Sequence, residues 1–357
     1  MIRPQLLMRM ARGPRVAVIA LVALVALYNG AAAQNLAFSL FERYLESLRV
    51  QVGIPAVSAA ILQDGQTVWE RGFGMADLEA SIAARPDTPY LVGDLTQVFT
   101  TMLLAQCAER GRVFPNELIQ KWLPLAPDPP ATIRQLLSHT GGASGTFKYD
   151  PARFALLTSV VEDCSKEPFR RTMFREVLDR FKLLDAIPGR DFAALVVDDE
   201  PMFDPITVQQ YVGIVQRLAV PYKVDKRRAT RSELPASYLN ASTGLVASVR
   251  DLAKFDGALS TLVRPDTLEQ LWTNQTVNGV TVPSALGWFS QIYQNEQIVW
   301  QFGVVPDSYS ALMLKVPTRR LTLILLANSD GLAAPFSLQN GDVTSSLFVQ
   351  PFLKLFL

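Results

Sequence analysis

The fold is decided by the stretch Thr88-Pro-Tyr-Leu-Val-Gly-Asp-Leu-Thr-Gln-Val-Phe-Thr-Thr-Met-Leu-Leu-Ala-Gln-Cys-Ala-Glu-Arg-Gly111. Pro86 and Pro89 keep the start extended, because a proline disfavours helical backbone in the residue before it. Gly111 tolerates the positive φ at which many helices end. Between these ends, apolar residues recur every three or four positions, at Leu95, Val98, Phe99, Met102, Leu103 and Ala105. This spacing predicts a central helix with a buried apolar face.

The start of this helix carries a pair of polar residues, Asp94 and Gln97. Their spacing is that of a capping box, in which Asp94 accepts from the third helical amide and the Gln97 side chain reaches back to the cap residue. We interpret the pair first as this structural device, which typically stabilises a helix by about 1 kcal/mol.

Strands are predicted on both sides of a helical middle region. Two apolar runs, at residues 55–62 and 67–74, flank Asp64-Gly65, a strong hairpin signal, and an amphipathic helix at residues 36–52 precedes them. Further strands are expected at residues 286–293, 298–303, 308–316 and 321–328, followed by a closing helix at 343–357. We therefore predict an α+β fold: an antiparallel β-sheet flanked by terminal helices, beside a helical lobe.

The first 33 residues have the pattern of an export signal. A basic segment precedes a short apolar run at residues 16–28, and Ala31-Ala-Ala33 offers a cleavage site before Gln34. The run is shorter than the ~20 residues of a usual membrane span, although an uncleaved anchor is the alternative. We expect a signal peptide at 1–33, one domain at 34–357, and a periplasmic or secreted protein without a stable membrane span after cleavage.

Composition excludes several classes of function. A net charge of +1 and a hydrophobic fraction of 49% give no electrostatic case for a nucleic-acid partner, and the basic run at residues 223–231 is expected to be a solvated loop. His139 is the sole histidine, and no spacing suggests that carboxylates complete a zinc site with it, so no metal site is expected. No cofactor is expected either. Cys107 and Cys164 are the only cysteines. Whether they pair is left open, with two buried thiols as the expectation.

The chain resembles the β-lactamase-related family of penicillin-recognising serine hydrolases, which includes class C β-lactamases, D-alanyl-D-alanine carboxypeptidases and esterases. That family has Tyr/Phe-x-x-x-Ser-x-x-Lys at the start of the central helix. Counting from Tyr90 places Asp94 at the serine and Gln97 at the lysine. Leu136-Leu-Ser-His-Thr-Gly-Gly142 and Leu286-Gly-Trp288 resemble other landmarks of the family, in the same order. The resemblance implies that His139 is a structural element near the pocket.

The other two elements of the family's pocket are also altered. Tyr149-Asp150-Pro151 matches a Tyr-x-Asn element of which only the tyrosine remains, and Gln301-Phe302-Gly303 matches Lys/His-x-Gly with only the glycine kept. The resemblance implies an oxyanion hole formed by the amides of Asp94 and Val304. A negative Asp94 there would repel the charge that develops on a substrate carbonyl.

These changes remove the groups that acyl transfer requires. A hydroxyl nucleophile and a nearby base are both missing, and Gln97 cannot take up a proton. We therefore expect no intact catalytic residue and a pseudoenzyme whose cleft, lined by Asp94, Tyr149, Gln301 and Val304, binds a peptidoglycan-like or small acyl ligand or a partner. The alternatives are a hydrolase with a non-standard nucleophile, such as Ser144, Ser308 or Ser310, and a structural module whose cleft is filled by side chains.

Overall fold

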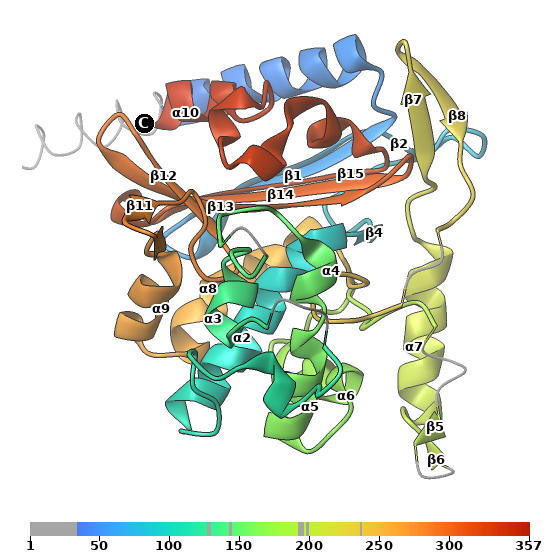
Figure 1. Ribbon diagram of the computed structural model, residues 1–357. Coiled ribbons are helices and arrows are strands. Elements are labelled where there is room, and N and C mark those ends of the chain that lie inside the picture. The colour runs from blue at the N-terminus through green and yellow to red at the C-terminus, as the bar shows by residue number, and fades with distance from the viewer. Residues whose placement is uncertain (1–33, 127–129, 143–144, 192–195, 198–199, 236–237) are drawn as a thin grey trace, which may run out of the picture.

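The structure is a computed structural model that describes residues 34–357 except 127–129, 143–144, 192–195, 198–199 and 236–237. The export-signal prediction therefore lies outside the described residues. The molecule is built on one seven-stranded antiparallel sheet in the order β12-β13-β14-β15-β1-β2-β3 (Figure 1). Its strands are β1 (Ala56–Gln63), β2 (Gln66–Asp77), β3 (Ile82–Ala83), β12 (Phe289–Tyr293), β13 (Glu296–Val305), β14 (Tyr309–Val316) and β15 (Leu321–Ala327). The predicted α+β architecture is confirmed.

The N-terminal hairpin joins the two ends of the chain. β1 pairs with β2 on one edge and with the late strand β15 on the other. Asp64 and Gly65 have φ values of 56° and 73°, the pair of positive angles that a two-residue type I′ turn needs. The turn predicted from Asp64-Gly65 is therefore confirmed.

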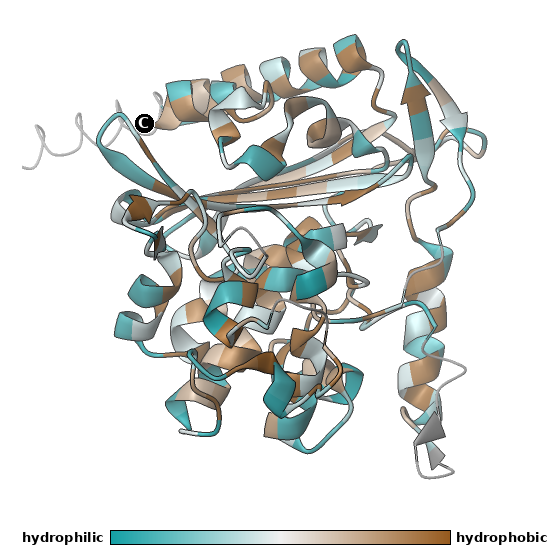
Figure 2. Cartoon of the chain, in the orientation of Figure 1, coloured by the Kyte–Doolittle hydropathy of each residue, from teal (hydrophilic) through white to brown (hydrophobic). Residues whose placement is uncertain are grey.

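Each face of the sheet is covered by different helices. The helix at residues 34–52 and α10 (Gln350–Phe356) pack side by side on one face, where Phe41 contacts Phe352 edge to face (Figure 1). The closing helix begins later than predicted, because Ser346 has extended backbone and Pro351 lies in the first turn of α10. Hydrophobic residues follow the strands between the two helical layers (Figure 2).

The helical lobe covers the opposite face and surrounds α2 (Thr96–Glu109), which follows a short 3₁₀ turn, η1 (Gly93–Leu95). Residues 96–107 are all buried, so α2 is central, as predicted, but buried on every side and not on one face alone. Phe99 stacks on Phe255 of α8 (Val249–Leu262), with ring centroids 3.9 Å apart. The other helices and helical turns of the lobe and its surroundings are η2 (Ile119–Lys121), α3 (Ile133–Leu137), α4 (Pro151–Phe154), α5 (Leu157–Ser165), α6 (Phe169–Met173), the π-helical turn Phe174–Asp179, α7 (Pro205–Gln216) and α9 (Pro265–Trp272). Short strand pairs are formed by β4 (Tyr90–Leu91) with β9 (Val246–Ala247), β5 (Val196–Val197) with β6 (Glu200–Pro201), and β10 (Thr276–Val277) with β11 (Val280–Thr281).

Two expectations for the middle of the chain are wrong. Cys107 of α2 and Cys164 of α5 form a disulfide, with Cα atoms 6.2 Å apart, because the packing of the two helices brings the cysteines within bonding distance. The basic run at 223–231 is not a loop: β7 (Tyr222–Asp225) and β8 (Arg228–Arg231) pair as a hairpin. Across the described ranges, no helix is both long and apolar enough to span a membrane.

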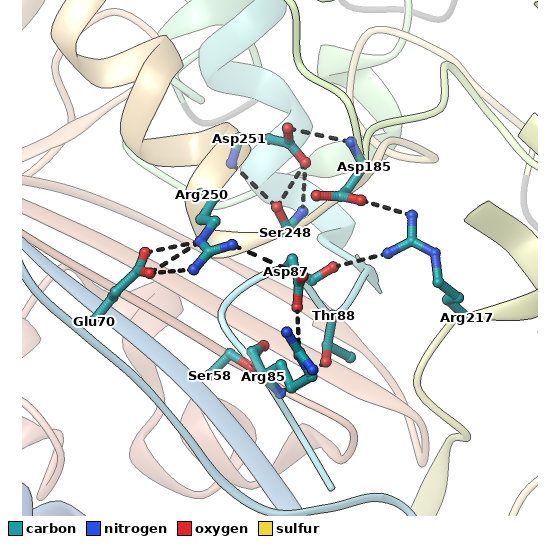
Figure 3. Close-up of polar contacts among 10 residues, drawn as sticks. All are labelled: Ser58, Glu70, Arg85, Asp87, Thr88, Asp185, Arg217, Ser248, Arg250 and Asp251. Carbon is teal, nitrogen blue, oxygen red and sulfur yellow. Dashed lines mark hydrogen bonds and ion pairs between the residues drawn. The ribbon is translucent and has the colours of Figure 1, made fainter. Parts of the chain in front are cut away.

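Ion pairs hold the loop that leads into η1 (Figure 3). Arg250 of α8 pairs with Glu70 of β2 at 2.5 Å and approaches Asp87 at 3.8 Å, and Arg85 also pairs with Asp87, at 3.2 Å. Arg217, just after α7, donates to the backbone carbonyl of Asp87 at 3.4 Å. Such partly exposed pairs contribute little stability, typically ~0.2–1 kcal/mol each. Their effect is to fix the path of the chain into the helix start.

Candidate functional site

Two glycines let β13 pass directly against η1. A Cβ atom on Gly303 would lie 1.9 Å from the carbonyl oxygen of Val92 and 3.0 Å from the amide nitrogen of Asp94, so no larger residue fits without a backbone shift. Gly93 has a φ of 53°, and a Cβ there would lie 3.0 Å from the amide nitrogen of Val304. The glycine retained at 303 therefore brings the backbone of β13 against the start of the central helix.

The Asp94 carboxylate lies in this junction and caps no helix. Tyr149 donates from its hydroxyl to Oδ2 at 3.2 Å, and Ser242 donates to Oδ1 at 3.4 Å. Neither η1 nor α2 has a side-chain cap hydrogen bond, so the capping-box prediction is wrong. The reason is that η1 starts before Asp94 and turns both Asp94 and Gln97 toward polar partners from other elements.

Burial raises the pKa of Asp94 to about 7, and the hydrogen bonds from Tyr149 and Ser242 offset only part of this shift. No opposite charge compensates, because neither donor carries a charge. Burial, with Asp94 as a further cause, raises the pKa of Tyr149 well above its ordinary value. Near neutral pH the site therefore contains a phenol beside a carboxyl group that is partly protonated.

Gln97 is the centre of the site, and its amide uses its full hydrogen-bonding capacity. Nε2 donates to Tyr149 Oη at 3.3 Å and to Ser242 Oγ at 3.0 Å. Oε1 lies 3.1 Å from His139 Nε2 and accepts from Gln301 Nε2 at 3.2 Å. Two donors and two acceptors are all that a primary amide offers. The neighbours of position 97 are thus arranged for an amide.

His139 reaches the site as a neutral donor. Its Nδ1 accepts from the backbone amide of Asp150 at 3.1 Å, which leaves the proton on Nε2 facing Gln97. Burial lowers the pKa of His139 to about 4, so the ring stays neutral at ordinary pH. His139 thus hydrogen-bonds to the other polar side chains at this junction through a single ring nitrogen.

Gln301 and the aromatic rings close the site from the sheet side. Gln301 Nε2 also donates to the carbonyl oxygen of Gly287 at 3.2 Å, and Oε1 accepts from the amide of Phe302 at 2.9 Å. The Tyr149 ring packs against Phe302 and Phe289, with centroids 5.1 and 5.7 Å away. We call the group of Asp94, Gln97, His139, Tyr149, Ser242 and Gln301 the Asp94 cluster.

The structure brings the sequence-predicted side chains together and adds one that was missed. Asp94, Tyr149 and Gln301 meet in the cluster, and Val304 lies beside them on β13. Ser242 was not identified, although it lies in Asn240-Ala-Ser-Thr-Gly244, two residues before a glycine with a φ of 107°. That glycine, where the backbone turns sharply, was the available signal. The cluster contains no lysine or arginine, and Asp94 is its one acidic side chain.

The molecule has the class of fold that serine β-lactamases and penicillin-binding proteins share. This fold is an antiparallel sheet beside a helical lobe, with a polar cluster at the start of a central helix. The chain belongs to the Beta-lactamase family, whose model matches residues 40–345. Similar solved structures include an octameric penicillin-binding protein homologue from Pyrococcus abyssi, with a TM-score of 0.69, 19% identity and coverage of 88% of this chain and 76% of that one. A class C β-lactamase from Rhodobacter sphaeroides has a TM-score of 0.66 and 15% identity, over 88% of this chain and 98% of the other.

Similarity to curated proteins is low. The chain is 22% identical to Unguisins hydrolase ungD' of Aspergillus campestris over 318 residues, which is 77% of this chain and 59% of that protein. Over 145 residues it is 26% identical to a teichoic acid D-alanine hydrolase of Staphylococcus aureus, covering 38% of this chain and 36% of that protein. The chain thus spans less than two thirds of the length of the curated relatives it matches.

Proposed function

We propose that the protein is a non-catalytic member of the Beta-lactamase family that binds a ligand or partner at the Asp94 cluster. The observation that carries this proposal is the four-bonded amide of Gln97 at the position of the family's lysine. An amide cannot accept a proton from a nucleophile, and the Gln97 amide is fixed in place by four hydrogen bonds. The general base of an acyl transfer is therefore absent from its usual place.

Asp94 adds a second obstacle to catalysis. A carboxylate attacks amides poorly, and its charge lies where family members stabilise an oxyanion. Tyr149 does not replace the base, because its raised pKa keeps the phenol protonated. We infer that the Asp94 cluster binds its ligand without turning it over, and that this ligand is a D-alanyl or related acyl compound of the peptidoglycan type. The similarity to a teichoic acid D-alanine hydrolase supports this ligand class.

One observation favours a second candidate, an active hydrolase with a non-standard nucleophile. Ser242 Oγ lies 3.4 Å from Asp94 Oδ1, and Asp94 has a pKa of about 7, which suits a general base. Against this, Ser242 is buried and its oxygen already accepts from Gln97. The first candidate therefore has the stronger support.

Labelling with fluorescent penicillin distinguishes the two candidates. We expect no covalent adduct on the full protein and no turnover of a chromogenic cephalosporin above the rate without protein, while an active class C β-lactamase serves as the positive control. A stoichiometric adduct on any side chain would overturn the non-catalytic proposal. If that adduct disappears in Ser242→Ala while the variant keeps the wild-type melting temperature, the second candidate is established.

We also propose that residues 1–33 are removed during export and that 34–357 form the mature domain in the periplasm or medium. The Cys107–Cys164 disulfide supports this location, because disulfides form and persist in oxidising compartments. Mass spectrometry of the protein isolated from a host that exports it should give a mature chain beginning at Gln34, without free thiols. A chain that retains Met1, or one with two alkylatable cysteines, would contradict the proposal.

A further inference from the structure

A cavity lies on the side of the helical lobe, between α2, α3 and α9, which are neighbours in Figure 1. Its volume is about 340 Å³, within the range of roughly 300–1,000 Å³ that is usual for small-molecule sites. Its apolar lining comes from all three helices and includes Leu104 and Ala108 of α2, Ile133 and Leu137 of α3, and Leu271 of α9. The cavity is therefore an apolar chamber with room for a small ligand.

This cavity is separate from the Asp94 cluster. Thr101 lines it one helical turn after Gln97, and Leu286 lines it one residue before Gly287, whose carbonyl accepts from Gln301. None of the six cluster residues contributes to its wall. Binding here would leave the cluster unblocked, so the two sites can be tested independently.

One charged side chain, Arg134, lines the cavity, and no aspartate or glutamate does. Arg134 donates from Nε to Asn116 Oδ1 at 3.3 Å and from Nη1 to Gln275 Oε1 at 3.2 Å, both neutral amides. Over the described ranges it forms no ion pair, although its side chain is only half-exposed. A guanidinium without a counter-ion beside an apolar chamber favours an anionic head group, and its planar fork matches a carboxylate.

We propose that this cavity is a binding site for a small amphipathic carboxylate, with its apolar body against α2 and α9 and its carboxylate on Arg134. The apolar wall supplies affinity by removing the ligand's chain from water, and Arg134 supplies selectivity for an acid over an alcohol or amine of the same length. The apolar body must be a single short chain or ring, because the chamber holds no more.

Titration calorimetry of the full protein with sodium octanoate tests the proposal, with octanol and octylamine as matched probes. We expect saturable binding of one octanoate per chain, and at least ~tenfold weaker binding of octylamine, since one charge-assisted contact is worth about that factor. Arg134→Gln should weaken octanoate by ~tenfold or more and leave octanol unchanged. Arg110→Gln, which removes an exposed arginine at the end of α2, is the control for net charge.

A blocking variant keeps the test decisive. Ala108→Phe places a ring in the chamber from a partly exposed position, so the fold should tolerate it, and melting curves will verify this. We expect it to abolish binding of both octanoate and octanol. If the wild type binds no octanoate, then no such site exists. The same conclusion follows if Arg134→Gln and Ala108→Phe both bind octanoate with the affinity of the wild type. The proposed function is tested by penicillin labelling and not by octanoate binding. A negative result with octanoate therefore rules out the cavity site without affecting the proposed function.

Discussion

Replacing Asp94 with asparagine is expected to stabilise the protein at pH 8 and to have little effect near pH 4. The folded state raises the pKa of Asp94 from an ordinary value of 3.8 to about 7, with burial as the main cause. Folding therefore favours the protonated acid. The stability that protonation provides is fully present below pH 3.8 and is lost as the pH rises to about 7.

The size of this effect follows from the shift. Each pKa unit corresponds to ~1.36 kcal/mol, so ionised Asp94 lowers the free energy of unfolding by as much as ~4 kcal/mol above pH 7. Asparagine fills the same volume and hydrogen-bonds to the hydroxyls of Tyr149 and Ser242 without carrying a charge. Urea unfolding of the wild type and Asp94→Asn between pH 4 and 8 measures the difference directly.

The difference between the two proteins can be assigned to Asp94, and one further variant serves as a control for charge. Burial also raises the pKa of Asp251, to about 6, but this residue is present in both proteins and cancels in the difference. Asp225→Asn removes the same charge from an exposed position of the β7–β8 hairpin and should change stability little at any pH. Equal stability of the wild type and Asp94→Asn at pH 8 would show that Asp94 is hydrated and has an ordinary pKa.

The sequence predicted the sheet well because its signals are local. Alternating apolar runs and the Asp64-Gly65 turn each specify a conformation within a few residues, and short connections favour antiparallel neighbours. The disulfide could not be predicted in the same way. It depends on how α2 and α5 pack, which is a relation between segments 57 residues apart along the chain.

The sequence predicted most of the residues that form the candidate site, but it did not predict the hydrogen bonds that their side chains make. The resemblance gave the positions of Asp94, Gln97 and Gln301, whereas the local pattern suggested a capping box that does not form. Side-chain direction there is set by groups that arrive from distant segments, such as Ser242 and His139. A motif of four residues contains no information about those partners, so the four-bonded amide could be found only in three dimensions.

Replacing Gln97 with methionine is expected to lower the free energy of unfolding by at least ~3 kcal/mol. The change leaves one buried N–H group on each of two side chains unpaired, at ~1–3 kcal/mol each, and removes two further hydrogen bonds at ~0.5–1.5 kcal/mol each. Methionine has nearly the same shape, so little of the loss comes from packing. These N–H groups belong to His139 Nε2, whose proton is fixed by Asp150, and to Gln301 Nε2, whose other N–H still donates to the carbonyl oxygen of Gly287. Urea unfolding at constant pH provides the measurement.

The same helix offers a matched control. Gln106 is also buried in α2, but within the described part of the chain its amide makes a single hydrogen bond, to the carbonyl oxygen of Leu262 at 3.1 Å. Gln106→Met should therefore cost only ~1 kcal/mol. If the two variants lose the same stability, the Asp94 cluster is hydrated and loosely held, and an amide at position 97 is no better suited to its surroundings than the lysine of active family members. A clearly larger loss at Gln97 means that the site is built around an amide, so that a lysine placed at this position would require changes to its neighbours as well.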